Sequence, residues 1–309
     1  MANGLTPSRR SSSTSHGVGR ELLRQLRLYL QLMRLDRPIG IWLLMWPTLW
    51  ALWIAGDGRP DPVNFLVFVT GVVVMRSAGC VINDYADRRF DGAVARTAGR
   101  PLATGSVAPM EALALFAVLG LVALALLILL NPLSRLLAVG GAVLAVVYPF
   151  TKRWLSAPQF VLGAAFGWGV PMAFAAEMGE LPRLAWLLWL DVVVWAVIYD
   201  TMYAMADRDE DLRIGIRSTA ILFGTADLFI LFLLEVVLIV GLLLAGVDAK
   251  LGGWYQASVA VAAVLFATQM WQIRHRDPGA CFRAFLANQH VGAAIFAGIV
   301  LDYTFRAAA

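Results

Sequence analysis

The sequence is poor in charged side chains: only 15% of its 309 residues are Asp, Glu, Lys or Arg, whereas 60% are hydrophobic. A soluble globular protein is about a quarter charged and about half apolar. The mean hydropathy of +0.72 and the long apolar stretches between charged loops therefore exclude an ordinary soluble protein. They indicate an all-α membrane protein that crosses the bilayer several times.

Cysteine and histidine are also scarce. The two cysteines, Cys80 and Cys281, cannot form a disulfide framework, and we interpret both as buried thiols. The three histidines, His16, His275 and His290, do not have the spacing of zinc ligands. These shortages exclude a disulfide-stabilised scaffold and argue against a zinc enzyme.

The N-terminal segment lacks the apolar core and the cleavage site of a secretory signal. Residues 1–20 are rich in serine and arginine, so we expect a disordered tail there and a single membrane domain over 21–309. An organellar transit peptide is an alternative interpretation of the same composition. From Glu21 to Leu35 leucines alternate with arginines, which is typical of an amphipathic helix on an anionic membrane face.

Apolar stretches of roughly 20 residues, the length that a helix needs to cross a bilayer, predict about nine membrane spans. They cover 39–56, 63–82, 108–130, 134–150, 158–176, 184–203, 225–246, 251–272 and 287–304. Most of the 25 lysines and arginines fall in the N-terminal segment and in alternate loops, which predicts a cytoplasmic N-terminus and an outer C-terminus. Because these basic residues anchor helices, the net charge of +4 indicates the lipid bilayer as partner and not a nucleic acid.

Two acidic motifs follow apolar stretches. In the first, Asn83, Asp87 and Asp91 recur every four residues, which would place an amide and two carboxylates on one face of a continuing helix. In the second, Asp207 and Asp211 repeat this spacing. Carboxylates at membrane helix ends repel one another unless a cation lies between them. Since Mg²⁺ is held by carboxylates together with substrate phosphates, we expect two acidic helix ends that face each other around Mg²⁺ and a diphosphate.

Basic side chains accompany both motifs. The arginines are Arg88, Arg89, Arg96 and Arg100 after the first motif, and Arg208, Arg213 and Arg217 after the second. A guanidinium fork suits a diphosphate, although cytoplasmic loops of membrane proteins are rich in arginine in any case. Lys152, Arg153 and Arg37 are further basic residues at the ends of predicted spans.

A transporter is the alternative from another functional class. It would use intramembrane carboxylates as a cation path, with acids near mid-span and inverted halves. The acidic motifs instead lie at helix ends and share one orientation, which favours an enzyme. Asp191 and Glu235 do fall inside predicted spans, where an ionisable side chain is a candidate functional residue.

The residues around both motifs resemble the UbiA intramembrane prenyltransferases. The resemblance is carried by Asn83-Asp84-x-x-Asp87-x-x-x-Asp91, by Arg96-Thr97-x-x-Arg100-Pro101-Leu102 and by Asp200-Thr201-x-Tyr203-Ala204-Met205-x-Asp207-x-x-x-Asp211. The segments 35–40, 148–153 and 214–219 are similar to the 4-hydroxybenzoate polyprenyltransferase branch of that family. The likeness runs from about Leu32 to Asp302, nearly the whole chain.

This resemblance implies nine helices around a central cavity that opens to lipid. It also implies that the ring of 4-hydroxybenzoate attacks a polyprenyl diphosphate, an early membrane step of ubiquinone biosynthesis. The Mg²⁺ ligands would be Asp87, Asp91, Asp207 and Asp211. The catalytic residues would be Asp207, Asp87 and Arg153, with Asp207 as proton acceptor. The substrate-binding residues would be Asn83, Arg88, Lys152, Arg37, Asp200 and Tyr203.

Two features of this assignment are open. Arg153 or Lys152 is expected to bind the carboxylate of the acceptor, but the same donors suit the diphosphate. Another acceptor, such as a naphthoate, a haem or a chlorin, is compatible with the acidic motifs. We expect the cell inner membrane as location, with an organellar inner membrane as the alternative.

Overall fold

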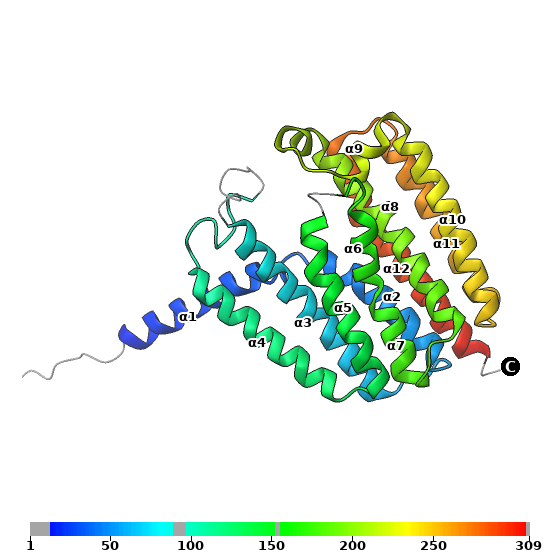
Figure 1. Cartoon of the computed structure of the whole chain (residues 1–309), viewed down its shortest axis with the longest axis horizontal. Helices are drawn as coiled ribbons and strands as arrows, with labels where there is room; N and C mark the ends of the chain where they lie inside the picture. Colours follow the sequence, from blue (N-terminus) through cyan, green and yellow to red (C-terminus); the bar gives the residue numbers. More distant parts are fainter. Residues whose placement is uncertain (1–12, 89–96, 152–154, 307–309) are drawn as a thin grey trace, which may run out of the picture. The chain divides into compact units, whose positions relative to one another are not determined.

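The computed structural model describes residues 13–88, 97–151 and 155–306, and every regular element in these ranges is a helix (Figure 1). The helices are α1 (Ser13–Leu32), α2 (Ile39–Ala55), α3 (Pro62–Asp87), α4 (Pro109–Ile128), α5 (Pro132–Thr151), α6 (Gln159–Gly167), α7 (Gly169–Met178), α8 (Arg183–Ile214), α9 (Thr219–Phe223), the 3₁₀ helix η2 (Gly224–Ala226), α10 (Asp227–Asp248), α11 (Gly253–Ile273) and α12 (Pro278–Arg306). The all-α fold that the composition predicts is confirmed.

Seven helical segments within the described residues are long and apolar enough to cross a membrane. They are Pro62–Asp87, Pro109–Ile128, Gln159–Met178, Arg183–Arg213, Thr219–Asp248, Gly253–Ile273 and Pro278–Arg306. The two other predicted spans correspond to the shorter apolar helices Ile39–Ala55 and Pro132–Tyr148. The multi-pass membrane character is therefore confirmed, whereas the expected count of nine spans is not.

The N-terminal helix differs from its predicted bounds. The helix α1 begins at Ser13, earlier than the expected Glu21, and it ends at Leu32 because Arg34 takes a left-handed backbone conformation with φ of 58°. Residues 1–12 of the expected tail lie outside the described residues.

The predicted span 158–176 is interrupted. It forms α6 and α7, which meet at Trp168. Pro171 has no N–H, so the carbonyl four residues earlier receives no helical hydrogen bond and the helix is weakened there. The indole of Trp168 lies against α5, where a Cβ added to Gly140 or Gly141 would come within 2.8 Å of the ring. Glycine thus makes room for the indole.

The chain divides into two units, and the boundaries between them fall inside α3 and α4. The first unit contains Met1–Pro38 and Met75–Gly120, and the second contains Ile39–Val74 and Leu121–Ala309. Each acidic motif belongs to a different unit, the first motif to the first unit and the second motif to the second.

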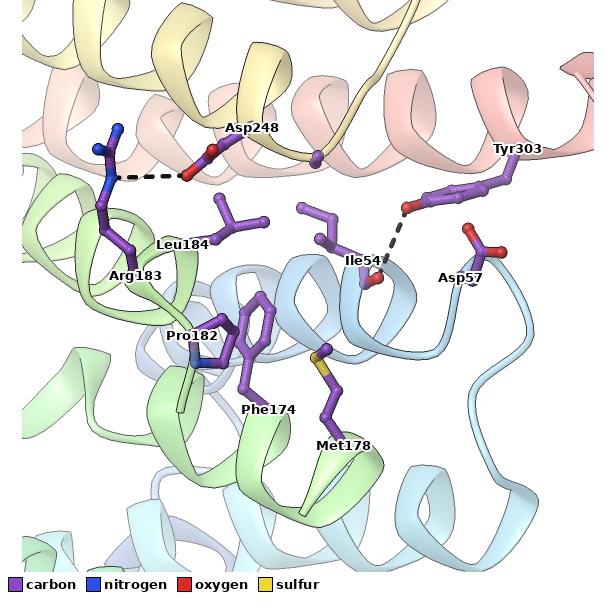
Figure 2. A pocket seen from close by; sticks show the side chains of 10 residues that line it. Ile54, Asp57, Phe174, Met178, Pro182, Arg183, Leu184, Asp248 and Tyr303 are labelled. Carbon is purple, nitrogen blue, oxygen red and sulfur yellow. Dashed lines mark hydrogen bonds and ion pairs between the residues drawn. The ribbon is translucent and has the colours of Figure 1, made fainter. Parts of the chain in front are cut away.

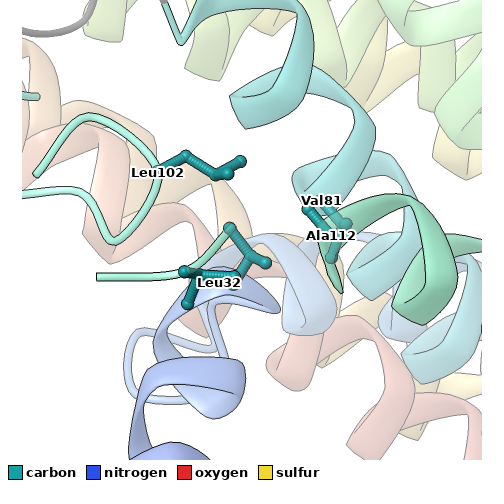
Figure 3. Packing of buried hydrophobic residues seen from close by; sticks show 5 residues of the cluster. Leu32, Val81, Leu102 and Ala112 are labelled. Atoms are coloured by element: carbon teal, nitrogen blue, oxygen red, sulfur yellow. The ribbon is translucent and has the colours of Figure 1, made fainter. Parts of the chain in front are cut away.

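The first unit has a small buried core. Leu32 of α1, Val81 of α3 and Ala112 of α4 pack together with Leu102 and Val107 of the connecting loop (Figure 3). The contact involves the last two turns of α3 and the first turn of α4. It therefore fastens α1 to the ends of two helices that are candidate membrane spans.

The second unit is built around α8, which packs against α6, α10 and α12. The rings of Trp50 in α2 and Trp195 in α8 stack with their centroids 5.3 Å apart. Both indole N–H groups donate to α12, Trp50 to the carbonyl of Gly292 at 3.0 Å and Trp195 to Oδ1 of Asn288 at 3.0 Å. Buried aromatic side chains with a polar handle thus connect three helices.

Replacing Gly292 by alanine is expected to destabilise this contact. The added Cβ would lie 2.5 Å from Trp46 and 2.7 Å from Trp195, and overpacking of this kind costs about 1–3 kcal/mol. Thermal unfolding in detergent should show a lower midpoint for Gly292→Ala. The matched control is Gly71→Ala in α3, where nothing lies within 4 Å of an added Cβ. Equal midpoints for the two variants would contradict the prediction.

Candidate active site

The first acidic motif lies at the C-terminal end of α3. Asn83 and Asp87 are one turn apart, so they share a face of the helix. Asn83 is half-buried, whereas Asp87, the last residue of α3, is exposed. The helix was expected to continue to Asp91, but Arg88 already lies in a turn and Asp91 falls outside the described residues. The structure therefore brings two of the three predicted donors onto one face.

Asp84 is held by two arginines. Its side chain is only 4% exposed, and its Oδ1 accepts from Nη2 of Arg34 at 3.1 Å and lies 3.0 Å from Nη1 of Arg100. A buried carboxylate requires such partners because it has lost its hydration. Arg34 has the left-handed backbone that follows α1. The residue next to Asn83 thus ties the motif to two other segments of the first unit.

Arg88 folds back onto the end of α3. Its Nη1 donates to the carbonyl of Tyr85 at 2.6 Å, and its guanidinium carbon lies 4.1 Å from the centroid of the Tyr85 ring. A cationic side chain at this position satisfies a carbonyl that has no helical partner and interacts favourably with the helix dipole. Arg88 is therefore kept beside the motif that it was predicted to assist.

The second acidic motif lies near the C-terminal end of α8. Asp200, Tyr203, Asp207 and Asp211 follow one another at intervals of three or four residues in an unbroken helix, so they share one face. All four are half-buried. The helix ends at Gly215, whose φ of 72° suits glycine and whose N–H donates to the carbonyl of Asp211. The predicted alignment of these side chains is thus present.

A second buried aspartate supports this end of α8. Asp227 is fully buried at the start of α10 and forms ion pairs with Arg208 of α8 and with Arg276, whose Nη2 lies 2.7 Å from Oδ1. Arg208 also donates to the carbonyl of Ala220 at 2.8 Å. The hydrogen bonds to Asp227 raise the pKa of Arg276. Arg208, a sequence candidate for diphosphate binding, therefore holds α8 to α10.

An aromatic group flanks the acidic face of α8. The ring centroid of Tyr203 lies 5.0 Å from that of Phe285 and 6.0 Å from that of Phe282, both in α12. Farther along α8, Tyr199 contacts Phe285 at 6.2 Å and Trp195 at 5.6 Å. Along α8, the carboxylates of the motif are thus directly preceded by turns that pack against aromatic side chains.

The basic candidates are only partly described. Lys152 and Arg153 lie outside the described residues. Arg37 is exposed in the connection between α1 and α2. Within the first unit it belongs to the same connection as Arg34, whose carbonyl accepts its N–H at 3.2 Å.

Asp191 and Glu235 are buried inside candidate spans, with 4% and 5% of their surface exposed. Asp191 lies close against α10, because a Cβ added to Gly241 would be 1.8 Å from its Oδ1. Asp191 lies nine residues before Asp200 on α8, on the opposite side of the helix, and Glu235 lies in α10. The structure does not bring Asp191 to the motif.

The donors of α8 fit a magnesium ion chemically. Mg²⁺ prefers oxygen ligands, keeps several waters, and is commonly held by one or two carboxylates together with substrate phosphates. Asp207 and Asp211 offer such a pair on one face. In the part of the chain that the structure describes, no three His, Cys, Asp or Glu side chains are grouped to hold a metal. The expected ligands come from both units, and one of them, Asp91, is not described.

A pocket of about 380 Å³ in the second unit lies at the other end of α8 (Figure 2). It is lined by apolar side chains such as Phe174 and Met178, and at its edge Nε of Arg183 lies 3.8 Å from Asp248. Arg183 is the first residue of α8, whereas Asp207 and Asp211 are near its last. This pocket is therefore separate from the acidic face.

The profile of the UbiA prenyltransferase family matches residues 44–293, a range that includes both acidic motifs. The chain belongs to this family. Over 278 residues it is 56% identical to the 4-hydroxybenzoate octaprenyltransferase of Ectopseudomonas mendocina, covering 90% of this chain and 94% of that protein. The UbiA membership that the two motifs predict is thus confirmed.

Solved UbiA structures have the same fold. A UbiA homolog from Aeropyrum pernix K1 matches with a TM-score of 0.73 at 27% identity, covering 85% of this chain and 97% of that one. A UbiA homolog from Archaeoglobus fulgidus, bound to GPP and Mg²⁺, matches with a TM-score of 0.69 at 15% identity, covering 89% and 99%. The latter likeness concerns the fold alone.

Sequence reasoning missed the roles of Arg34 and Asp227. Arg34 was interpreted as part of a surface helix, yet it pairs with Asp84, a residue fifty positions away. Asp227 stands at the start of an apolar stretch and has no motif around it. The sequence does show an aspartate directly before a long apolar stretch. A carboxylate that becomes buried at such a position needs a cationic partner, and this was the available signal.

The variant Asp84→Asn is expected to loosen the first motif. Removing one partner of a buried ion pair costs about 3–5 kcal/mol, and less where the arginines are partly exposed, as Arg34 is at 29% and Arg100 at 22%. We expect a lower thermal midpoint and a higher KM for the prenyl donor. Steady-state kinetics with the donor varied would measure the latter. The control Asp36→Asn, in an exposed position, should leave both unchanged. Wild-type values for Asp84→Asn would refute the positioning role.

Proposed function

We propose that this protein is an integral-membrane aromatic prenyltransferase that transfers a polyprenyl group to 4-hydroxybenzoate. The new bond forms at the ring carbon ortho to the hydroxyl, an early step of ubiquinone biosynthesis. The observation that carries the proposal is the acidic face of α8, Asp200, Asp207 and Asp211, inside the range that matches the UbiA family. The choice of acceptor rests on the 56% identical relative named 4-hydroxybenzoate octaprenyltransferase.

The proposed cofactor is Mg²⁺, and its ligands are drawn from Asp87, Asp91, Asp207 and Asp211. Asn83, one turn before Asp87, adds an amide oxygen to the same face. The Archaeoglobus fulgidus homolog was bound to GPP together with Mg²⁺, which supports a metal that acts with the diphosphate. When bound, such an ion neutralises charge on the departing diphosphate.

The chain's own cationic side chains then assist departure of the diphosphate. Arg88, fixed beside the first motif, and the exposed Arg37 are donors for its oxygens, as is Arg153. As the allylic C–O bond breaks, the electron pair leaves with the diphosphate, whose charge these groups stabilise. Asp200 and Asp207 lie on the acidic face of α8. We expect the diphosphate end of the prenyl donor to point toward this face.

The aromatic flank suits the apolar part of the reaction. Tyr203 with Phe282 and Phe285 offers ring faces that stabilise a cationic allylic carbon and exclude water from it. The ring carbon of 4-hydroxybenzoate forms the new C–C bond to that carbon. The proton displaced from the ring carbon passes to a carboxylate, for which we assign Asp207 because it lies one turn from Tyr203 on the same face.

The proposed location is the cell inner membrane, with the N-terminus and both motifs on the cytoplasmic side. The support is the arginine-rich sequence that follows each motif, since cytoplasmic loops carry an excess of basic residues. Both the prenyl donor and the prenylated product are lipid-soluble, so an enzyme embedded in the bilayer meets them directly.

Exchanging Asp207 for asparagine is expected to reduce prenyl transfer by about a hundredfold or more, because it removes both a metal ligand and the proton acceptor. Product formation should be measured over a range of Mg²⁺ concentrations. The matched control is Asp209→Asn: Asp209 is exposed and lies on the opposite side of α8, so its loss should change nothing. If both variants retain full activity at every Mg²⁺ concentration, the acidic face is not the metal site.

Arg153→Ala and Lys152→Ala test recognition of the acceptor. A desolvated benzoate carboxylate needs a cationic partner, so at least one variant should raise the KM for 4-hydroxybenzoate with a smaller effect on kcat. A diphosphate contact would instead alter the kinetics of the prenyl donor. Arg183→Ala, at the opposite end of α8, is the control. Naphthoate and chlorin acceptors should be assayed in parallel, and turnover of one of these in place of 4-hydroxybenzoate would overturn the proposed acceptor.

A further inference from the structure

The helix α1 has an exposed apolar stripe. Leu22, Leu23 and Leu26 are 66%, 59% and 52% exposed, although leucine is a residue that folding normally buries. The next turns behave differently, because Leu28 and Leu32 pack into the core of the first unit. At 100° per residue Leu22 and Leu26 lie on the same side of α1 as Tyr29 and Met33, which pack against that core, so the exposed leucines continue the apolar side of α1 beyond the turns that the first unit covers.

Arginines form a second, cationic side of the same helix. At 100° per residue, Arg20, Arg24 and Arg27 fall within about 60° of one another and lie roughly 120° around α1 from the mean direction of the exposed leucines. All three are exposed, and Arg24 pairs with Glu21 at 2.6 Å across a solvent-accessible surface. The helix thus has one apolar side, which is packed on the protein at its C-terminal turns and exposed at its N-terminal turns, and one cationic side.

The depth of α1 relative to the bilayer follows from what it packs on. Its core contacts are Val81, in the last two turns of α3, and Ala112, in the first turn of α4 (Figure 3). Both helices are candidate spans, and α1 is not. A helix fastened to the ends of two spanning helices lies at the level of a membrane face. At that level an apolar stripe meets acyl chains and an adjacent cationic stripe meets phospholipid headgroups.

We propose that α1 lies in the membrane–water interface and binds anionic phospholipids. Leu22, Leu23 and Leu26 enter the outermost acyl layer, while Arg20, Arg24 and Arg27 bind the phosphates of anionic headgroups. The arginine charge favours anionic over zwitterionic lipids, by roughly fivefold for each arginine near the surface. Because Arg34 follows α1 directly and pairs with Asp84, this interfacial helix is attached to the first acidic motif.

The first experiment measures the depth of α1 with the full chain in vesicles. Leu23→Cys and, on the cationic side, Gln31→Cys would carry an environment-sensitive fluorophore; the native Cys80 and Cys281 are buried. In vesicles of phosphatidylglycerol and phosphatidylcholine, spin-labelled lipid should quench the label at position 23, and iodide should quench the label at 31. Iodide quenching of both labels would overturn the proposal. So would a label at 23 that neither quencher reaches, since that outcome indicates a covering protein.

The second experiment measures lipid selectivity without any enzymatic readout. The triple variant Arg20→Gln, Arg24→Gln, Arg27→Gln should retain at least fivefold less phosphatidylglycerol relative to phosphatidylcholine after purification from mixed vesicles. The charge-matched control is Arg59→Gln, Lys250→Gln, Arg283→Gln, which removes three exposed cations elsewhere and should keep most of the selectivity. An equal loss in both variants would refute a specific role for α1.

Discussion

A carboxylate removed from water must be given cations, and both acidic helix ends of this protein are held in this way. Asp84 stands inside the first motif and is bound by Arg34 and a second arginine. Asp227 is bound by Arg208, the residue after Asp207, and likewise by a second arginine. Each buried aspartate therefore fixes a helix end without being one of the exposed or half-buried carboxylates available to a metal. Each unit thus contains a buried aspartate that fixes a helix end and more exposed carboxylates that are candidate metal ligands.

This arrangement explains why acidic residues of the same motif have different environments. Asp87 is exposed and Asp84 is buried although they are one turn apart. On α8 the motif side chains are half-buried and share their face with Tyr203, which connects them to a cluster of aromatic rings. Acidic and apolar aromatic side chains therefore stand on consecutive turns of one helix, and these surroundings would suit the polar end and the apolar chain of the proposed prenyl donor.

The parts of the structure that could be predicted from the sequence are those set by periodicity along one helix. The four-residue spacing of Asp207 and Asp211 correctly predicts a shared face on α8, because helical geometry alone determines it. The break at Trp168 was missed although Pro171 is visible in the sequence. The pairing of Arg34 with Asp84 could not be predicted, since tertiary packing brings together residues that no local pattern links. The expected continuation of α3 beyond Asp87 was wrong, since Arg88 lies in a turn, and a role for Asp91 stays a prediction.

The length of α8 determines the depth of its acidic side chains. From Arg183 to Asp207 the helix rises by roughly 36 Å at 1.5 Å per residue, whereas the hydrocarbon core of a bilayer is about 30 Å thick. A continuous helix that begins at one membrane face therefore carries Asp207 and Asp211 past the hydrocarbon and into the opposite headgroup layer. The proposed diphosphate and metal would be hydrated in that layer, while the apolar turns before Tyr203 remain at the depth of the acyl chains. One uninterrupted helix thus spans both the apolar and the hydrated environment that the proposed prenyl diphosphate would need.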